Sequence, residues 1–178
     1  MAERVVVAGA GHAAGQLVAR LRAEEFAGEI VLVGDEATLP YQRPPLSKAY
    51  MAGEIGLERV LLRNQAFYDD NNIDVRLNTR VDAVDCDAKS VTLNDGEKLE
   101  YTHLVLATGT RVRELPVAGA GLSGVFYLRS LGDADGIGTA LKTTPRVAVV
   151  GGGYIGLEVA AIARKAGCEV TVLEAMPR

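Results

Sequence analysis

The sequence predicts an α/β protein made of two strand–helix–strand units, with a small antiparallel β-meander. Each unit opens with a short apolar strand that runs into a glycine cluster, GAGHAA at residues 9–14 and GGGYIG at residues 151–156. A helical stretch and a second apolar strand follow each cluster, which is typical of a Rossmann-like dinucleotide-binding unit. Because the second unit stops soon after its second strand, we predict that it is incomplete and that the chain is the first part of a longer protein.

The first unit occupies about the first thirty-five residues. Residues 4–8 form a β-branched run that is typical of a buried parallel strand. Residues 12–26 place Leu17, Val18 and Leu21 at helical spacing, and residues 30–33 are the next strand. This order predicts a βαβ unit.

The middle of the chain mixes short helices and strands. Residues 38–52 are interrupted by prolines and then predict a helix that starts near Leu46 or Ser47. Residues 64–71 predict a helix with Asn64 as its N-cap. Residues 73–77 and 103–107 predict strands. Between them, an Asn-Asp-Gly turn divides the extended segments of residues 81–101, which indicates the meander.

The second unit follows a linker rich in Pro and Gly at residues 111–124. Residues 125–128 predict a short strand, and residues 130–142 predict a helix that starts at Ser130 or Asp133. The βαβ unit then comprises, in order, a strand, a helix ended by Gly167 and a second strand at residues 147–150, 154–165 and 169–173. We therefore place one domain at residues 1–112 and the start of a second at residues 113–178.

The composition is that of an ordinary globular protein, with 48% hydrophobic and 24% charged residues. The net charge of −4 argues against nucleic acid or an anionic membrane as a partner. Cys86 and Cys168 form no Cys-x-x-Cys pair and no cluster with histidine, so neither a metal site nor dithiol chemistry is indicated. We see no signal peptide and no apolar run of about 18 residues, and we expect a cytoplasmic protein.

The first glycine cluster has the residues that a dinucleotide pyrophosphate needs. Gly9 permits a tight turn, Gly11 permits close approach of the phosphate to the backbone, and Ala14 stands where Gly or Ala is required. The helix that follows directs free N–H groups at the phosphate. Asp35, after the second strand, can accept hydrogen bonds from ribose hydroxyls. The alternative is a glycine-rich turn without a ligand.

The second cluster is complete at Gly151, Gly153 and Gly156, and Glu174 ends its second strand. A glutamate there accepts from a ribose 2′-hydroxyl and repels a 2′-phosphate, which favours NAD over NADP. Arg178 keeps NADP open, because NADP sites use arginine. Two dinucleotide sites in one chain indicate two cofactors, and a flavin with a nicotinamide is the economical pair, because a hydride can pass between them.

Three segments carry a family resemblance. The segments are YQRPPLSKAYMAG at residues 41–53, LVLATG at residues 104–109 and VVGGGYIGLE at residues 149–158. They resemble the FAD-dependent ferredoxin reductases of the pyridine nucleotide-disulfide oxidoreductase superfamily, of the putidaredoxin and rubredoxin reductase type. The resemblance covers essentially the whole chain. Members are longer and carry a further flavin motif, so we expect these 178 residues alone to bind FAD poorly and to be nearly inactive.

The resemblance also implies which residues contact each cofactor. For FAD they are Gly9, Gly11, His12, Ala13 and Ala14 at the pyrophosphate, Asp35 at the ribose, Arg43, Pro45, Lys48 and Arg129 at the flavin, Val81 at the adenine, and Ala107, Thr108 and Gly109 close by. For NADH they are Gly151, Gly153, Tyr154, Ile155, Gly156 and Glu174. Each of two of these residues has an alternative role without a cofactor. His12 could simply occupy a variable position of the turn, and Tyr154 could pack against the start of the helix.

Lys48 and Glu158 are the candidate catalytic residues. A lysine ammonium near the flavin would stabilise negative charge that develops in the reduced ring. A carboxylate beside it would keep the lysine charged and in position. The alternative is that Lys48 is a solvated surface charge and that Glu158 interacts only with the helix dipole. The resemblance favours the catalytic pair.

The implied activity is transfer of electrons from NADH through FAD to a 2Fe–2S ferredoxin or a rubredoxin. Such a carrier feeds a cytochrome P450 or a ring-hydroxylating oxygenase. One alternative is an NADH oxidase or disulfide reductase, which needs a redox cysteine near the flavin, and Cys86 is the sole conceivable substitute. Others are an NADH-sensing flavoprotein of the apoptosis-inducing-factor type and a nucleotide-binding module without catalysis.

Overall fold

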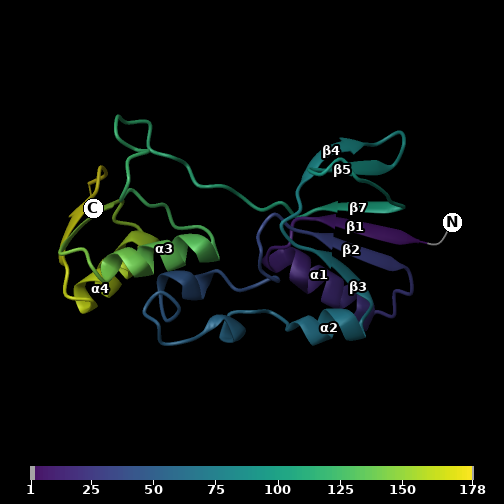
Figure 1. Ribbon diagram of the computed structural model, residues 1–178, viewed down its shortest axis with the longest axis horizontal. Coiled ribbons are helices and arrows are strands. Elements are labelled where there is room, and N and C mark those ends of the chain that lie inside the picture. The colour runs from purple at the N-terminus through teal and green to yellow at the C-terminus, as the bar shows by residue number, and fades with distance from the viewer. Residues whose placement is uncertain (1–2, 178) are drawn as a thin grey trace. The chain divides into compact units, whose positions relative to one another are not determined.

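The computed structural model of the protein describes residues 3–177, which form two units (Figure 1). Unit 1 contains residues 3–42 and Leu61–Thr110. Unit 2 contains Arg43–Val60 and residues 111–177. Each unit is therefore assembled from two separate stretches of the chain. The domain boundary near residue 112, which concerns cofactor binding, stays a prediction.

A four-stranded parallel sheet forms the centre of unit 1 (Figure 1). Its strands in spatial order are β3 (Ile73–Arg76), β2 (Glu29–Val33), β1 (Arg4–Ala8) and β7 (His103–Leu106). In β1 and in β2, four of the five residues are buried and apolar. Parallel strands carry such continuous apolar runs when both faces of the sheet are covered.

Two helices cover one face of this sheet, α1 (His12–Ala23) and α2 (Gln65–Asp70) (Figure 1). The shared core consists of Val5, Val7, Ala14, Val18, Ile30, Leu32, Leu39, Tyr68 and Ile73. The Asn64 side chain accepts a hydrogen bond from the Phe67 N–H at 3.1 Å. Asn64 therefore caps α2, as the sequence predicts.

The meander covers the opposite face of the sheet. It consists of β4 (Val81–Asp85), β5 (Ser90–Leu93) and β6 (Lys98–Glu100), which pair antiparallel. Its buried side chains pack on the second face of β1 and β2, in a cluster of Val6, Val31, Val33, Val91, Leu93 and Leu99. Gly96, at φ +89°, forms the turn between β5 and β6. The predicted α/β fold with an inserted meander is confirmed.

Arg22 on α1 donates hydrogen bonds to four backbone carbonyls. Its Nη1 donates to Phe26 O at 2.6 Å and to Gly28 O at 2.8 Å. Its Nε donates to Asn71 O at 2.8 Å, and its Nη2 donates to Asn72 O at 2.9 Å. The first two acceptors lie between α1 and β2, and the other two lie between α2 and β3. One guanidinium thus fixes two turns at the edge where β2 and β3 begin.

The hydroxyl of Tyr68 is a buried polar group in the core beneath α2. Within residues 3–177, its oxygen has no hydrogen-bond partner, and the side chain is fully buried. Burial raises the pKa of Tyr68 to about 12, and the positive charge of Arg63 opposes that shift. A buried hydroxyl without a partner has lost its hydrogen bonds to water, so this group lowers the stability of unit 1.

We expect Tyr68→Phe to raise the free energy of unfolding by about 1 kcal/mol, as measured by urea denaturation at pH 7. The parent protein should lose stability as the pH rises from 10 toward 12, because the unfolded tyrosine then ionises while the folded one does not. The Tyr68→Phe variant should lose less stability over this pH range. Tyr50→Phe is the control, since the Tyr50 hydroxyl donates to Asp135 Oδ1 at 2.8 Å. Equal gains in both variants would contradict this account of Tyr68.

Unit 2 contains the second βαβ unit. β8 (Arg146–Val150) and β9 (Glu169–Leu173) pair in parallel, and α4 (Tyr154–Lys165) connects them. Gly167, at φ +92°, lies just beyond the end of α4. The elements of this unit lie where the sequence predicts them.

A capping box starts the other helix of unit 2, α3 (Leu131–Leu141). Ser130 Oγ accepts a hydrogen bond from the Asp133 N–H at 3.2 Å, and Asp133 Oδ2 accepts one from the Ser130 N–H at 2.7 Å. Each side chain thus satisfies a backbone N–H that the helix leaves free. Of the two predicted starts, Ser130 is confirmed as the N-cap.

Residues 43–60 pack with α3 and α4 and carry two short 3₁₀ helices, η1 (Pro44–Ser47) and η2 (Leu57–Arg59). The side-chain bonds that join them to the rest of unit 2 include Arg43 Nη1 to Arg129 O at 2.5 Å, Tyr50 OH to Asp135 Oδ1 at 2.8 Å, and Lys165 Nζ to Glu54 Oε1 at 2.7 Å. Residues 43–60 are thereby held against both helices.

Two predicted elements are wrong. The helix expected after the proline pair is only η1 followed by turns, because the backbone of Lys48 leaves the helical region at φ −132° and ψ −121°. Residues 125–128 form no strand, because no described strand pairs with them. β-branched and aromatic residues favour a strand only where a partner strand is present.

Three further properties bear on function. No helix in residues 3–177 has the length and apolar character that a membrane crossing needs. Within the same residues, no group of three or more His, Cys, Asp or Glu side chains is placed to hold a metal ion. Cys86 is an exposed free thiol and Cys168 is a buried one.

Candidate dinucleotide sites and a lysine–glutamate pair

The first glycine cluster makes a sharp turn between β1 and α1. Gly9 has φ +108°, and its N–H donates to Val33 O at 2.8 Å. A Cβ at this position would lie 2.3 Å from Ala107 O. The end of β7 therefore passes directly over Gly9, which brings Ala107 and the following Thr108 and Gly109 to the first glycine cluster. Only glycine fits this contact and this φ.

The amino terminus of α1 is open to a ligand. Gly11 is the N-cap and has no side chain with which to cap the helix. A Cβ placed on Gly11 would meet no described atom within 4 Å. His12 and Ala13 are exposed in the first turn, whereas Ala14 is buried against the sheet. Helix N–H groups in open space attract an anion, so this geometry fits the pyrophosphate of a dinucleotide.

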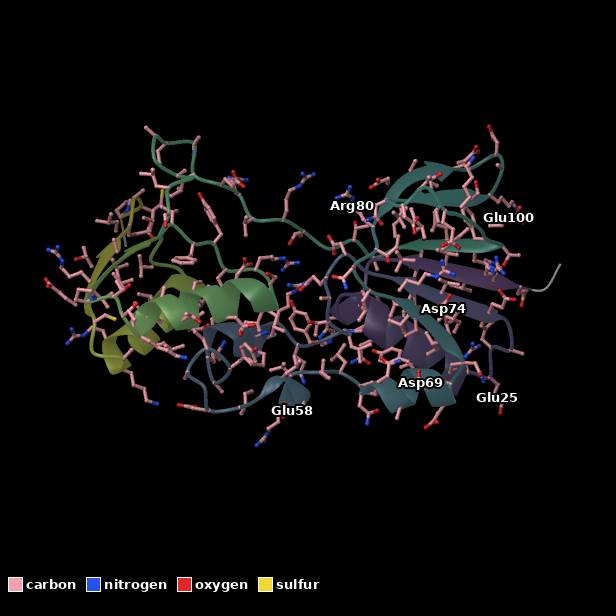
Figure 2. All side chains as sticks on the ribbon, in the orientation of Figure 1. Glu25, Glu58, Asp69, Asp74, Arg80 and Glu100 are labelled. Atoms are coloured by element: carbon pink, nitrogen blue, oxygen red, sulfur yellow. The ribbon has the colours of Figure 1, made fainter. Side chains whose placement is uncertain are left out.

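Asp35 stands at the end of β2, on the same edge of the sheet. The segment after β3 crosses beside it, because Thr79 N–H donates to Gly34 O at 2.8 Å. Arg80 follows, and Figure 2 shows it beside the meander. The pKa of Arg80 is raised, mainly by its hydrogen bond to Asp82 and to a lesser extent by the charge of Asp35. Sequence reasoning missed Arg80, since only the fold brings it to Asp35.

The second glycine cluster repeats this geometry in unit 2. Gly151 has φ +104°, and its N–H donates to Leu173 O at 2.8 Å. Gly153 is the N-cap of α4, and a Cβ there would meet no described atom within 4 Å. Gly156 packs so closely that a Cβ would lie 2.0 Å from Gly151 O. Tyr154, at 90% exposure, projects into solvent from the first turn of α4.

Glu174 reaches over this turn from the end of β9. One carboxylate oxygen accepts a hydrogen bond from the Gly152 N–H at 2.7 Å, and the other accepts from the Met176 N–H at 2.9 Å. The carboxylate is thus fixed next to the glycines. Arg178, which the sequence suggests for the choice between NAD and NADP, lies outside the described residues.

Lys48 and Glu158 form an ion pair within unit 2. Lys48 Nζ lies 3.0 Å from Glu158 Oε1. Ser47 Oγ donates to the other oxygen, Glu158 Oε2, at 2.5 Å. The pKa of Glu158 is lowered, first by the hydrogen bond from Ser47 and then by that from Lys48. Sequence reasoning found Lys48 and Glu158 but missed Ser47, although Ser47 directly precedes the lysine.

The predicted site residues divide between the units. Unit 1 holds Gly9, Gly11, His12, Ala13, Ala14, Asp35, Val81, Ala107, Thr108 and Gly109. Unit 2 holds Arg43, Pro45, Lys48, Arg129, Gly151, Gly153, Tyr154, Ile155, Gly156, Glu158 and Glu174. Each glycine cluster thus lies with its own acidic residue, and the residues of segment 43–48 that are predicted to contact a flavin lie with Arg129. Their roles toward a cofactor stay predictions.

Solved structures share this fold. The ferredoxin reductase for the CYP199A2 system from Rhodopseudomonas palustris matches with a TM-score of 0.91 and 42% identity, over 96% of this chain and 42% of that one. The covalent putidaredoxin reductase–putidaredoxin complex matches with a TM-score of 0.89 and 48% identity, over 96% of this chain and 42% of that one.

Sequence comparison gives the same relationship. Rhodocoxin reductase of Rhodococcus erythropolis is 47% identical over 174 residues, which are 98% of this chain and 41% of the relative. The chain thus spans less than half the length of the curated relatives it matches. The pyridine nucleotide-disulphide oxidoreductase family profile matches residues 3–178. The chain therefore belongs to the pyridine nucleotide-disulphide oxidoreductase family.

Proposed function

We propose that the protein passes electrons from NADH through FAD to a 2Fe–2S ferredoxin or a rubredoxin. The observation that supports this most directly is the presence of two open glycine turns in one chain, each followed by an acidic residue at the end of the next strand. Similar chains include reductases named for rhodocoxin and putidaredoxin. By analogy, the reduced carrier would serve a cytochrome P450 or a ring-hydroxylating oxygenase.

The residues of unit 1 fit the adenosine diphosphate half of FAD. The turn at Gly9 and the open helix end at Gly11 would bind the pyrophosphate, and Asp35 would accept hydrogen bonds from the ribose. Val81 would lie near the adenine, with Arg80 as an added neighbour. FAD, when bound, accepts a hydride and gives up electrons one at a time.

The residues of unit 2 fit NADH and the flavin edge. Gly151, Gly153 and Gly156 would bind the second pyrophosphate, and Glu174 would hold the ribose and disfavour NADP. Lys48, charged and held by Glu158, would stabilise negative charge that develops near it. No residue need act as a general base, because hydride transfer depends on positioning and electrostatics.

The other activities considered for this fold have less support. An oxidase or disulfide reductase would need a thiol at the flavin. Cys86 is exposed on the turn after β4, and the Cys168 Sγ donates to Thr144 O at 3.1 Å inside unit 2. No observation in residues 3–177 favours a thiol mechanism or an NADH-sensing role. Two free thiols are consistent with the reducing cytoplasm, where we place the protein.

Paired substitutions at the two helix N-caps test the cofactor assignment. Gly11→Ala should weaken FAD binding at least about tenfold and leave NADH binding unchanged, because a methyl group would occupy the phosphate position. Gly153→Ala should weaken NADH binding and leave FAD binding unchanged. Isothermal titration with each dinucleotide measures both constants, and each variant is the control for the other. If either variant lost affinity for both dinucleotides, or if it lost affinity for neither, the proposal of two separate sites would be contradicted.

Electron transfer is tested under anaerobic conditions with excess FAD and NADH. We expect the chain to reduce an added 2Fe–2S ferredoxin slowly but faster than the same mixture without the chain. Visible absorbance of the ferredoxin measures the rate. Lys48→Met should lower this rate and leave the affinity for NADH unchanged. A ferredoxin reduced no faster than in the mixture without the chain would argue against the proposed activity.

A further inference from the structure

Ser47 is a buried side chain at a site otherwise made of solvated charges. It is the last residue of η1 and is only 5% exposed. The Lys48 side chain is 52% exposed and the Glu158 side chain is 29% exposed. The fixed member of this group is therefore the serine, which belongs to neither glycine cluster.

The hydroxyl of Ser47 and the ammonium of Lys48 divide the carboxylate between them. Ser47 Oγ donates to Glu158 Oε2, and Lys48 Nζ lies against Oε1. An ion pair between two long, partly exposed side chains is held weakly in one geometry, because both chains lose rotamer freedom. A buried hydroxyl on one oxygen sets the plane of the carboxylate and directs the other oxygen at Lys48.

Lys48 has a second acceptor, whereas Ser47 gives Glu158 a second donor. Lys48 Nζ also lies 3.4 Å from Pro44 O. If the ammonium turns toward another partner, Glu158 keeps a hydrogen bond to its charged form. The carboxylate can therefore stay in place while Lys48 moves.

The other charges near α4 do not replace this contact. The elements packed against α4 are η1, β8 and β9. The charged groups on or beside these elements and on the last turn of α4 are Arg43, Lys48, Arg146, Glu169, Glu174, Arg164 and Lys165. Of these described groups, Lys48 is the one that pairs with Glu158. Arg146 and Glu169 are the first residues of β8 and β9. Glu158 lies near the amino end of α4, which follows the last residue of β8, so it is at the opposite end of these strands.

We propose that Ser47 is a positioning residue, which holds the Glu158 carboxylate aimed at Lys48 through a hydrogen bond that persists when Lys48 turns away. The proposal deepens the proposed function, because it rests on Lys48 acting at the flavin. A purely structural role for Ser47 would instead be to pack in the contact between η1 and α4, with no influence of its hydroxyl on the carboxylate. The two roles differ in what happens to the pKa of Glu158 when the hydroxyl is removed, because a hydrogen bond to the carboxylate favours its charged form.

Carbon-13 NMR of the Glu158 side-chain carboxyl, titrated with pH in the chain without cofactor, separates these roles. Ser47→Ala should move the titration midpoint of Glu158 upward, and Ser47→Thr should leave it close to the parent value. Ser90→Ala, at a second buried serine in β5, is the matched control and should not move it. An unmoved midpoint in Ser47→Ala, with or without a lower melting temperature, would overturn the proposal.

Lys48→Met gives a second test that does not alter Ser47. The Glu158 midpoint should stay below its ordinary value in this variant, because the serine still donates. A midpoint that returns to the ordinary value would overturn the proposal, since Lys48 alone would then set the charge. These readouts need no flavin. Failure of the dinucleotide titrations would remove the proposed function and leave the result on Ser47 standing.

Discussion

Gly9→Ala should lower the free energy of unfolding of unit 1 by about 3 kcal/mol or more. The new methyl group would lie 2.3 Å from Ala107 O, which is a backbone atom at the end of β7 and cannot rotate away. The residue would also have to keep φ +108°, which costs a non-glycine residue about 1–3 kcal/mol. Relief of the overlap would require β7, the edge strand of this sheet, to shift away from its hydrogen-bonded partner β1.

Urea denaturation measures this loss, and Gly96→Ala is its control. Gly96 lies in the same unit at φ +89°, but a Cβ there would meet no described atom within 4 Å. That variant therefore reports the cost of the backbone conformation without the overlap. The difference between the two variants isolates the contact between Gly9 and β7. Equal losses would show that β7 moves aside at little cost.

Arg22→Ala should destabilise unit 1 by about 2–4 kcal/mol. The substitution leaves four carbonyls without their donor, and hydrogen bonds to a charged group contribute about 1.5–3 kcal/mol each, with little additivity within one network. Both turns before β2 and β3 would loosen together. Amide hydrogen exchange should therefore speed up at residues 24–28 and 71–72.

Arg20→Ala is the matched control on the same helix. Arg20 is exposed, and within the described part of the chain its side chain pairs with Glu24, one helical turn away. Such a pair contributes about 0.5 kcal/mol or less, so the control should be nearly as stable as the parent. Arg22→Lys should fall between the two, since one ammonium cannot reach four acceptors in two directions. A loss in Arg22→Ala no larger than that in Arg20→Ala would contradict the assigned role.

Much of the fold could be predicted because its signals are local. The second βαβ unit needs only residues that stand close together in the sequence, namely an apolar run, Gly151 and Gly153, helical spacing and Gly167. Asn64 and Ser130 cap their helices through residues three positions on. Such signals are complete in the sequence and are not overridden by the rest of the fold.

Contacts over long separations could not be predicted in this way. The bond from Ser47 to Glu158 spans 111 positions, and the bonds from Arg22 to the second turn span 49 and 50. Ser47 reads as an ordinary helix-starting residue, and Arg22 reads as one more charge on the surface of a helix. The sequence shows which residue types are present, but only the packing of the elements shows which oxygen each donor meets.

The assembly of each unit from two stretches sets a limit on dissecting the protein. A single cut near residue 112 would release a piece in which residues 43–60 are present but Arg129, Asp135 and Glu158 are not. The other piece would keep α3 and α4 and lose the segment that packs on them. The first piece then holds all of unit 1 but leaves residues 43–60 without their partners, and the second piece holds an incomplete unit 2, so isolated halves cannot be used to assign one cofactor to each. That assignment requires point substitutions in the intact chain.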